Sequence, residues 1–196
     1  MNDALAAYFE KHIAVAKETH AALGPQIAAV GQILCKSFAA GGKLLTFGNG
    51  GSAADSQHLA EEMIGRFLRP RRSLPAISLT SDGTALTCIA NDFGFTDIFA
   101  RQIAALARPG DVVIGISTSG NSQNVLRGLA EAKMNRAITV ALLGNTGGQI
   151  AGEVDHALIV PATITSHIQE MHIVIAHLLC DIVDRWAAGE NTGESD

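Results

Sequence analysis

A glycine-rich turn between a short apolar run and an amphipathic stretch constrains the fold of this chain more than any other feature. Residues 43–47 form the apolar run, which predicts a buried strand, and the letters GNGGS at 48–52 follow it directly. Apolar residues then recur at helical spacing from Ala54 to Phe67. Glycine allows a sharp turn here, and the free N–H groups at the start of a helix suit phosphate or another anion. The stretch therefore predicts a strand–turn–helix unit that holds an anion.

The rest of the chain repeats this alternation of apolar runs with amphipathic stretches. Four further runs predict strands at 75–79, 112–116, 138–143 and 157–160. Helices are expected at 83–90, 96–107 and 123–133, with a last helix at about 165–187. Apolar strands that alternate with helices are typical of a parallel sheet covered on both faces. We therefore expect an α/β fold with a doubly wound, five-stranded parallel sheet.

The two ends of the chain lie outside this alternation. Two helices are expected before the first strand, at 3–22 and 26–40, because Gly24-Pro25 interrupts the apolar pattern. A chain of 196 residues is most simply one domain. Within it we assign residues 1–42 to the N-terminal helices, which would form a packing or oligomer surface. Residues 43–188 form the α/β domain, and residues 189–196 form a polar tail that is expected to be frayed.

Composition disfavours several classes of function. Lys and Arg number 14 against 19 Asp and Glu, so the chain lacks the basic excess that nonspecific nucleic-acid binding requires. No run of about 18 apolar residues predicts a membrane span, and the first residues do not resemble a signal peptide. Cys35, Cys88 and Cys180 are isolated in apolar surroundings, which indicates small buried residues in a reducing cytoplasm rather than a disulfide framework.

A hydroxyl-rich turn, STSGNS at 117–122, follows the third strand. Its four hydroxyl groups and the helix start behind them suit a phosphate ester held without a lysine. An N-cap in an ordinary turn is the plainer explanation, since Ser, Thr and Asn are favoured there too. The glycine turn matches neither GxGxxG nor GxxxxGK(S/T), which disfavours dinucleotides and nucleoside triphosphates. Because both turns follow strands of one parallel sheet, we expect them to face the same crevice.

His58 and Glu62 are four residues apart and share a helix face behind the glycine turn. They are either surface residues or ligands of a divalent metal, for which His and carboxylate side chains are suited. The last helix offers further candidates in His167, Gln169, Glu170, His172 and His177. Gln169 and His177 project to similar sides, yet about 12 Å of straight helix separates them. One ion would take both only if the helix start is irregular or a neighbouring subunit contributes.

Other polar residues are weaker candidates. Asn91-Asp92, before Phe93-Gly94, is expected to be a turn, with or without a role in binding. A basic cluster is expected to be a solvated loop, in which Arg66 is the residue best placed to reach a ligand phosphate; its members are Arg66, Arg69, Arg71 and Arg72. Three histidines lack partners in the sequence and are expected at the surface or in packing: His12, His20 and His156.

The chain resembles the phosphoheptose isomerases, which are sugar isomerase (SIS) domain proteins, over nearly its whole length. Five stretches carry the resemblance: GNGGSAADSQHLAEEMIGRF, AND, GDVVIGISTSGNSQNVL, LLGNTGG and IQEMHIVIAHLLCDIVD. This family converts D-sedoheptulose 7-phosphate into D-glycero-D-manno-heptose 7-phosphate, which feeds heptose nucleotide synthesis for lipopolysaccharide and other surface glycans. The resemblance implies an SIS-type five-stranded parallel sheet, a homotetramer with sites between subunits, and one bound zinc ion per subunit.

The resemblance also implies roles for individual residues. The zinc ligands would be His58, Glu62, Gln169 and His177. Substrate contacts fall on Asn49, Gly50, Gly51, Ser52, Glu62, Asn91, Asp92, Ser117, Thr118, Ser119, Ser122 and Gln169. Glu62 is the expected base and His177 the expected acid of an aldose–ketose isomerisation, which moves a proton between C1 and C2 through an enediol. Zinc would polarise the substrate oxygens, and the hydroxyl-rich turn would hold the phosphate.

Two other functions stay open. Replication-initiator-associating SIS proteins bind a partner without catalysis, but they typically lack a carboxylate at the position of Glu62. An SIS isomerase of another sugar phosphate is the second alternative, because the length of the sugar is not legible in the sequence. The pattern IQE…H in the last helix favours the heptose group. His, Gln and Glu ligands would also accept divalent ions other than zinc.

Overall fold

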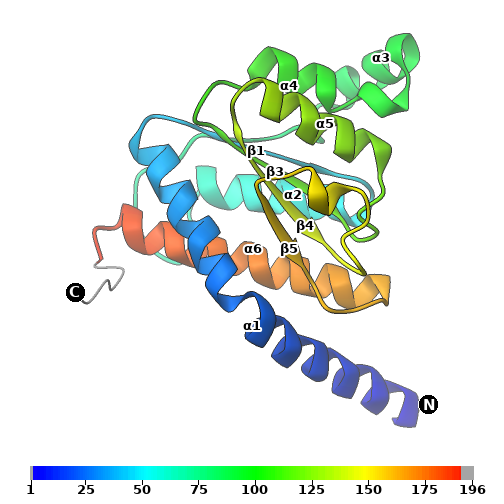
Figure 1. Cartoon of the computed structure of the whole chain (residues 1–196). Coiled ribbons are helices and arrows are strands. Elements are labelled where there is room, and N and C mark those ends of the chain that lie inside the picture. Colours follow the sequence, from blue (N-terminus) through cyan, green and yellow to red (C-terminus); the bar gives the residue numbers. More distant parts are fainter. Residues whose placement is uncertain (1, 191–196) are drawn as a thin grey trace.

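Five parallel strands form one sheet in the computed structural model, which describes residues 2–190 (Figure 1). Their order across the sheet is β2-β1-β3-β4-β5, and every neighbouring pair is parallel. The strands are β1 (Leu44–Gly48), β2 (Ala76–Ser78), β3 (Val112–Ser117), β4 (Ile138–Leu143) and β5 (His156–Ile159). The five-stranded parallel sheet expected from the sequence is confirmed, because each apolar run that predicts a strand lies in it.

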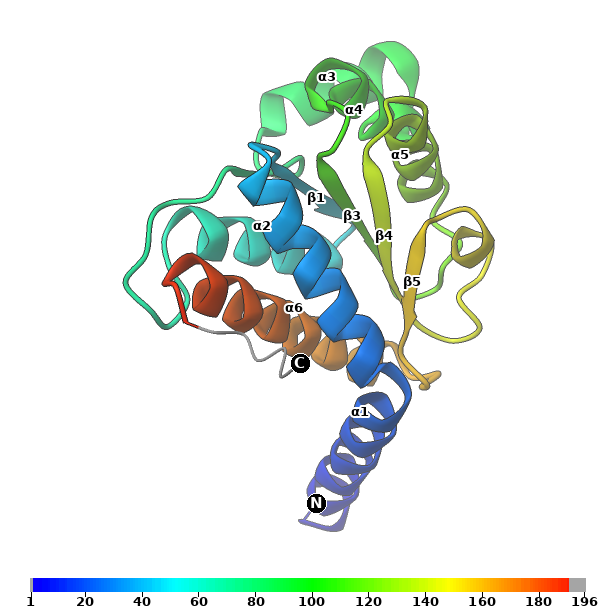
Figure 2. The ribbon, with the colours of Figure 1, turned by 60° about the vertical axis from the view of Figure 1, so that its left-hand side comes forward.

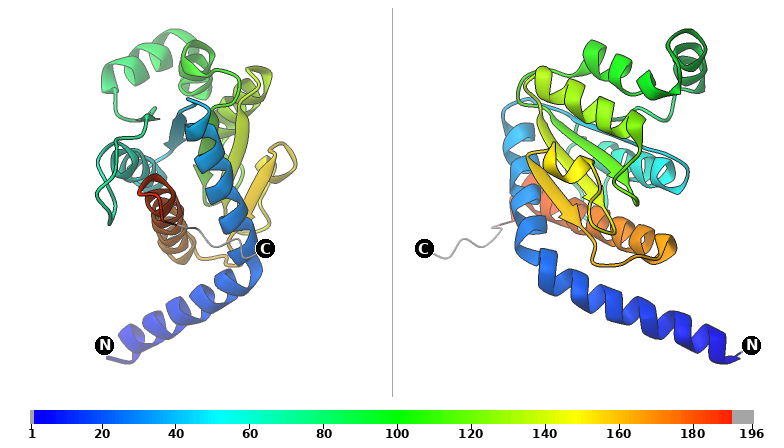
Figure 3. Two further views of the ribbon diagram at one scale, coloured as in Figure 1. Left: turned by 90° about the vertical axis from the view of Figure 1, so that its left-hand side faces the viewer. Right: turned by 45° about the vertical axis from the view of Figure 1, so that its right-hand side comes forward.

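Helices cover both faces of this sheet, as Figure 3 shows. One face carries α1 (Asn2–Ala39), α2 (Gly51–Ile64) and α6 (Thr165–Ala187). The other carries α3 (Gly83–Phe93), α4 (Ala100–Leu106) and α5 (Gln123–Met134), with short 3₁₀ turns at Phe95–Asp97 and Ile150–Gly152. Successive strand residues point to opposite faces, so Leu44 lies in the first core and Leu45 in the second. The doubly wound α/β fold is therefore confirmed.

The N-terminal region is one helix, not the two helices that Gly24-Pro25 predicts. α1 runs from Asn2 to Ala39 with Pro25 inside it, and Figure 2 shows that it bends and that its first half projects from the body. A proline inside a helix removes one hydrogen bond and bends the axis. Leu23 and Ile27, four residues apart around the proline, are both buried in the first core. Their packing offsets the lost hydrogen bond, so the helix continues through the bend.

Three local expectations are also corrected. Asn91 and Asp92 lie in the last turn of α3 and not in a loop, because the helix continues to Phe93 and ends at Gly94, whose φ is +91°. The helix expected at 96–107 is divided into a 3₁₀ turn and α4. Cys35 and Cys180 are buried as expected, whereas Cys88 is exposed on α3, which buries no residue completely.

The expected frayed tail, 189–196, falls mostly on residues 191–196, which lie outside the described residues. Within the described part, Glu190 Oε1 accepts a hydrogen bond from Arg69 Nε at 2.9 Å. Among the described helices, none combines the length and the apolar character needed to cross a bilayer.

The order of the strands predicts a ligand-binding crevice between the ends of β1 and β3. These two strands are neighbours, and Gly48 at the end of β1 pairs with Ile116 near the end of β3. The chain leaves β1 toward β2 through α2, and it leaves β3 toward β4 through α5, in the opposite direction across the sheet. Such a reversal opens a crevice at the carboxyl ends of the strands, where α/β proteins bind ligands. The glycine turn and the hydroxyl-rich turn both lie at this edge.

Candidate active site

The glycine turn leaves the start of α2 without a side-chain cap. Gly50 is the N-cap residue with φ +55°, and no side chain caps the first turn of the helix. A Cβ on Gly48 would lie 2.7 Å from the Cβ of Ser52, so the chain turns too tightly there for a larger residue. The N–H groups of Ser52 and Ala53 donate to the carbonyl oxygens of Asn49 and Gly50, each at 3.0 Å. The helix dipole and the Gly51 N–H group are what the first turn offers to an anion without competition from a capping side chain.

The hydroxyl-rich turn gives α5 a similar start. Ser122 occupies the N-cap position, but its hydroxyl caps no backbone N–H and lies 3.1 Å from the Ser117 hydroxyl. The backbone of Thr118 is held in place, because its carbonyl oxygen accepts a hydrogen bond from Asn145 Nδ2 at 3.1 Å. The Ser119 side chain is exposed. The plain N-cap explanation is thus wrong for the Ser122 hydroxyl, which remains in the turn where a ligand could use it.

Two asparagines join the turns. Asn49 Nδ2 donates to Asn124 Oδ1 at 2.9 Å, and Asn124 Nδ2 donates to Asn49 Oδ1 at 2.8 Å. Asn124 is buried, and its Oδ1 also accepts the backbone N–H of Val125 at 2.9 Å. The sequence analysis missed Asn124, although a polar residue two positions after the STSGNS turn was a signal. The paired amides hold the two sides of the crevice in register.

His58, Glu62 and His177 come together where α2 packs on α6. The Nε2 atoms of His58 and His177 are 3.0 Å apart, and His58 Nε2 lies 3.6 Å from Glu62 Oε1. Two ligands of a tetrahedral zinc ion, each about 2.0 Å from the metal, lie about 3.3 Å from one another. The two distances from His58 are close to this value, and imidazole nitrogens and a carboxylate oxygen are suitable ligands. His58, Glu61 and Glu62 also form a group whose donor atoms all lie within 4.8 Å of one another.

Glu61 was missed by the sequence analysis. Its Oε1 lies 3.1 Å from Nδ1 of His58, the ring nitrogen that does not face His177. A carboxylate on the second ring nitrogen fixes the tautomer and orientation of a metal-binding histidine. The three-residue spacing between His58 and Glu61 places both on one side of the helix and could have revealed this partner.

A buried ion pair fixes the surroundings of His177. The Phe67 ring stacks on the His177 ring with centroids 5.3 Å apart, and the next residues, Leu68 and Arg69, donate their backbone N–H groups to Asp184. Arg71 Nε donates to Asp184 at 2.7 Å, and Arg71 Nη2 donates to the Glu62 carbonyl oxygen at 2.7 Å. This arrangement ties the end of α2 to α6 beside the metal-ligand candidates.

The basic cluster therefore differs from the expected solvated loop. Arg71 and Asp184 have side chains that are 1% and 0% exposed. Arg69 pairs with Asp181 at 2.6 Å, and the Arg72 guanidinium lies 5.7 Å from the centre of the Trp186 ring. Arg66 and Arg72 are both exposed, as expected of a solvated loop. Most of the cluster serves to attach this segment to α6.

Gln169 does not lie with the other three metal-ligand candidates. Its Nε2 donates to Asp55 Oδ1 at 2.6 Å, one turn of α2 before His58, while His177 contacts His58 two turns further along α6. Asp55 is buried, and its Oδ2 has no partner in the described part of the chain. Burial raises the pKa of Asp55 more than Gln169 and His58 lower it. Asp55, which the sequence analysis did not single out, thus offers an unsatisfied oxygen at the crevice.

Asn91 and Asp92 are not brought to the crevice by this chain. Both are exposed on α3, across the sheet from α2. Their side-chain hydrogen bonds within the described residues are local: Asn91 Nδ2 donates to Asp92 Oδ1 at 2.8 Å, and Cys88 lies near Asp92 Oδ2.

Comparisons with known proteins agree with this architecture. The SIS domain model matches residues 7–144. The phosphoheptose isomerase of Geotalea daltonii is 54% identical over 168 residues, which are 86% of this chain and 88% of that protein. The solved phosphoheptose isomerase of Neisseria gonorrhoeae has a TM-score of 0.89 at 41% identity and covers 93% of this chain and 98% of its own.

A second solved structure, the phosphoheptose isomerase of Francisella tularensis, has a TM-score of 0.91 at 39% identity over 93% of this chain and 97% of its own. The sequence relative and the two solved structures thus match the chain over most of their own lengths. The chain therefore belongs to the SIS domain family and, within it, to the phosphoheptose isomerases, a group of aldose–ketose isomerases that act on sugar phosphates.

Proposed function

We propose that this isomerase converts D-sedoheptulose 7-phosphate into D-glycero-D-manno-heptose 7-phosphate. The observation that carries the proposal is the convergence of His58, Glu62 and His177 where the second half of α2, the helix that follows the glycine turn, packs on α6. An isomerase that moves a proton between C1 and C2 needs a base, an acid and a group that stabilises charge on the neighbouring oxygens. These three side chains can supply all of them.

Glu62 is the proposed base. It removes a proton from C1 of the ketose and returns it to C2, so that the reaction passes through an enediol with no net loss of atoms. His177 is the proposed acid, which donates its proton to the carbonyl oxygen at C2 and is restored by the hydroxyl proton from C1. Stacking by Phe67 and the Arg71–Asp184 pair support this assignment, because they fix the ring and the end of α2.

The donor set fits one zinc ion per chain. His58, Glu62 and His177 would hold it, with Glu61 orienting His58. When bound, the ion polarises the carbonyl and hydroxyl oxygens of the substrate. Gln169 is the proposed fourth ligand and a substrate contact. Since its amide is bonded to Asp55 within one chain, this role requires the amide to leave Asp55 or to come from a neighbouring subunit.

The phosphate is proposed to bind at the two turns. The hydroxyl groups and backbone of Ser117, Thr118, Ser119 and Ser122 receive it at the start of α5, where the helix dipole favours negative charge. The turn at 49–52 then faces the reacting end of the sugar. Asn91 and Asp92 remain proposed substrate contacts, supplied from α3 of a neighbouring subunit because they are remote from this chain's own crevice.

We propose a homotetramer with sites between subunits, since Asn91 and Asp92 would have to come from a neighbouring chain. The projecting half of α1 exposes Leu5, Phe9 and Ile13, which recur every four residues and form one apolar stripe. An apolar groove of about 580 Å³ lies between α1 and α6 and is lined by residues that include Ile27, Val174 and Leu178. Exposed apolar surfaces of this kind favour association with further copies of the chain. We further propose a cytoplasmic enzyme whose product enters heptose nucleotide synthesis for surface glycans.

Purified protein incubated with sedoheptulose 7-phosphate tests the proposed substrate, with heptose 7-phosphate measured by coupled phosphorylation or by NMR. Ribulose 5-phosphate and fructose 6-phosphate serve as shorter competitors. We expect kcat/KM to be highest for the seven-carbon ketose. A higher kcat/KM for a shorter sugar would assign a different substrate to the same fold. Absence of turnover with all three in zinc-supplemented protein would contradict the proposed reaction.

A further inference from the structure

A second cluster of metal-ligand side chains lies away from the proposed active site, where the first half of α1 meets the start of α6. His12 Nδ1 is 2.7 Å from Glu170 Oε2, and His167 Nδ1 is 2.8 Å from the same oxygen. The three donor atoms lie within 4.8 Å of one another. Sequence analysis assigned His12 to the surface or to packing, because its partners are 155 and 158 residues distant in the chain. The fold alone brings them together.

Neighbouring residues hold these groups in place. The Tyr8 hydroxyl donates to Glu170 Oε1, the other carboxylate oxygen, so that Oε2 is left facing the two histidines. The Tyr8 ring also packs on the His167 ring with centroids 4.4 Å apart. The His167 side chain is almost completely buried, while His12 and Glu170 are partly exposed at 35% and 27%. The cluster therefore has a fixed inner wall and an open outer side.

We propose that His12, His167 and Glu170 form a second metal site, distinct from that of His58, which takes a Zn²⁺-class divalent ion. Two imidazole nitrogens and one carboxylate oxygen are a recognised zinc ligand set, and the open side leaves a fourth position for water. Nitrogen-rich sites select zinc, nickel, cobalt or copper over Mg²⁺ and Ca²⁺, which prefer oxygen ligands.

Binding needs only small changes in this cluster. The present distances of 2.7 and 2.8 Å are those of hydrogen bonds from two imidazole N–H groups to one carboxylate oxygen. Ligands of one tetrahedral zinc ion lie about 3.3 Å apart, so each of these two distances has to lengthen by about half an ångström. Each ring also moves its proton from Nδ1 to Nε2, which leaves the Nδ1 lone pair free to bind the ion.

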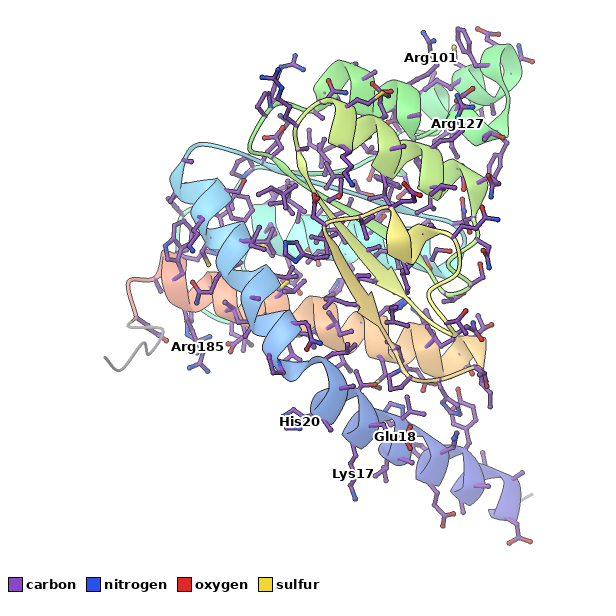
Figure 4. The ribbon with its side chains drawn as sticks, viewed as in Figure 1. Lys17, Glu18, His20, Arg101, Arg127 and Arg185 are labelled. Carbon is purple, nitrogen blue, oxygen red and sulfur yellow. The ribbon has the colours of Figure 1, made fainter. Side chains whose placement is uncertain are left out.

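An ion here would tie the projecting half of α1 to α6. His12 lies before the bend at Pro25, whereas His167 and Glu170 lie on the first turns of α6. Figure 4 shows that Lys17 and His20, on the same half of α1, point away from the rest of the molecule. A bound ion would therefore strengthen the contact between α6 and the first half of α1, a half with much exposed surface.

Zinc binding by the full-length protein tests the proposal. The protein is stripped with a chelator, and the equivalents of zinc that it retains are measured by equilibrium dialysis. We expect two equivalents per chain for the natural sequence, one for His12→Asn and one for His58→Asn. His20→Asn is the matched control, because His20 lies on the same helix and is exposed; it should retain both equivalents. Glu170→Gln gives a second test that leaves α1 unchanged and should also lose one.

The outcomes separate this site from the proposed active site. If His12→Asn and Glu170→Gln bind as much zinc as the natural sequence, the proposal is wrong and the cluster is a hydrogen-bonded contact only. The same conclusion follows if the natural protein binds one equivalent that only His58→Asn removes. If the single equivalent is instead lost in His12→Asn, the second site stands and the active-site metal is the assignment that fails.

A protease digest adds a structural check. Zinc should slow cleavage after Lys11 in the His58→Asn variant, and it should not do so in the double variant that also carries His12→Asn.

Discussion

Glu62 is the residue at which chemistry and stability can best be separated. Its carboxylate lies beside His58, while its backbone carbonyl is held by Arg71. Glu62→Gln keeps the backbone contact and nearly the same shape but removes the base. We expect kcat to fall by at least about 100-fold, as is usual when a general base is lost. The fold and the assembly should be unchanged by circular dichroism and light scattering.

The matched control for this variant is Glu153→Gln, an exposed glutamate distant from the crevice, which should keep full activity. Substantial residual turnover in zinc-loaded Glu62→Gln would remove Glu62 from the role of base. The zinc content of the variant is measured in parallel, because this distinguishes loss of the base from loss of the metal.

His172 predicts how stability depends on pH. It is completely buried, and its Nε2 lies 3.0 Å from the Leu143 carbonyl oxygen. Burial lowers the pKa of His172 from 6.5 to about 4 in spite of this hydrogen bond. The unfolded chain therefore takes up a proton at a higher pH than the folded chain does. Stability should fall as the pH decreases from 6.5 toward 4, by about 2 kcal/mol between pH 7 and pH 5.

Urea titrations at pH 7 and pH 5 measure this loss. His172→Gln retains a donor for the Leu143 carbonyl but cannot take up the proton, so the free energy of unfolding of this variant should change less between the two pH values. An equal change in the variant and in the natural protein would show that other groups cause the dependence.

Single residues also mark the limit of sequence reasoning. His58, Glu62 and His177 could be named because residue type and helical spacing are visible in the chain. The contacts of Asn124 with Asn49 and of Asp55 with Gln169 could not be named, because they join distant segments. His167 and Glu170 were candidates on the last helix, but their contact with His12 depends on the fold. The separation of Gln169 from His177 was foreseen from the rise of a helix, and the structure confirms that Gln169 has another partner.

Among the structural elements, the start of α5 carries the clearest expectation. Ser122 leaves its hydroxyl in the turn and Ser119 is exposed. The double variant Ser119→Ala and Ser122→Ala should therefore raise KM about tenfold or more, the loss expected for one or two hydrogen bonds to a charged group. The effect on kcat should be smaller, because the phosphate is remote from the reacting carbons.

Steady-state kinetics with varied sedoheptulose 7-phosphate provide the test, and Ser73→Ala, in an exposed segment, is the control. An unchanged KM in the double variant would show that this turn does not hold the phosphate.

For the helices and strands, the sequence predicts that an element exists better than it predicts where the element ends. The strands and α6 were predictable because long apolar patterns determine them. α1 was predicted as two helices because Gly24-Pro25 usually ends a helix, and burial of Leu23 and Ile27 on either side outweighed that local preference. Asn91 and Asp92 were placed in a turn because polar residues before glycine favour one, although Gly94 ends α3 only after them.

The whole molecule is expected to act as a tetramer, with a mass of about 82 kDa, four times the 20.4 kDa of one chain. Phe9 is 67% exposed on the apolar stripe of α1. Phe9→Glu places a charge on this surface, where burying it would be costly, and should shift the protein to smaller species with lower activity. Light scattering coupled to size exclusion measures the change, with Lys17→Glu as control. A tetramer that persists in Phe9→Glu would place the interface elsewhere.

The proposed reaction, isomerisation of sedoheptulose 7-phosphate, depends on a metal that we propose is held by His58, Glu62 and His177. The most direct test is the initial rate of heptose 7-phosphate formation by one preparation in three states: as purified, after removal of metal by a chelator, and after zinc is added back. We expect the rate to be lost in the second state and restored in the third. A rate that is the same in all three states, with metal content confirmed by elemental analysis, would contradict the claim.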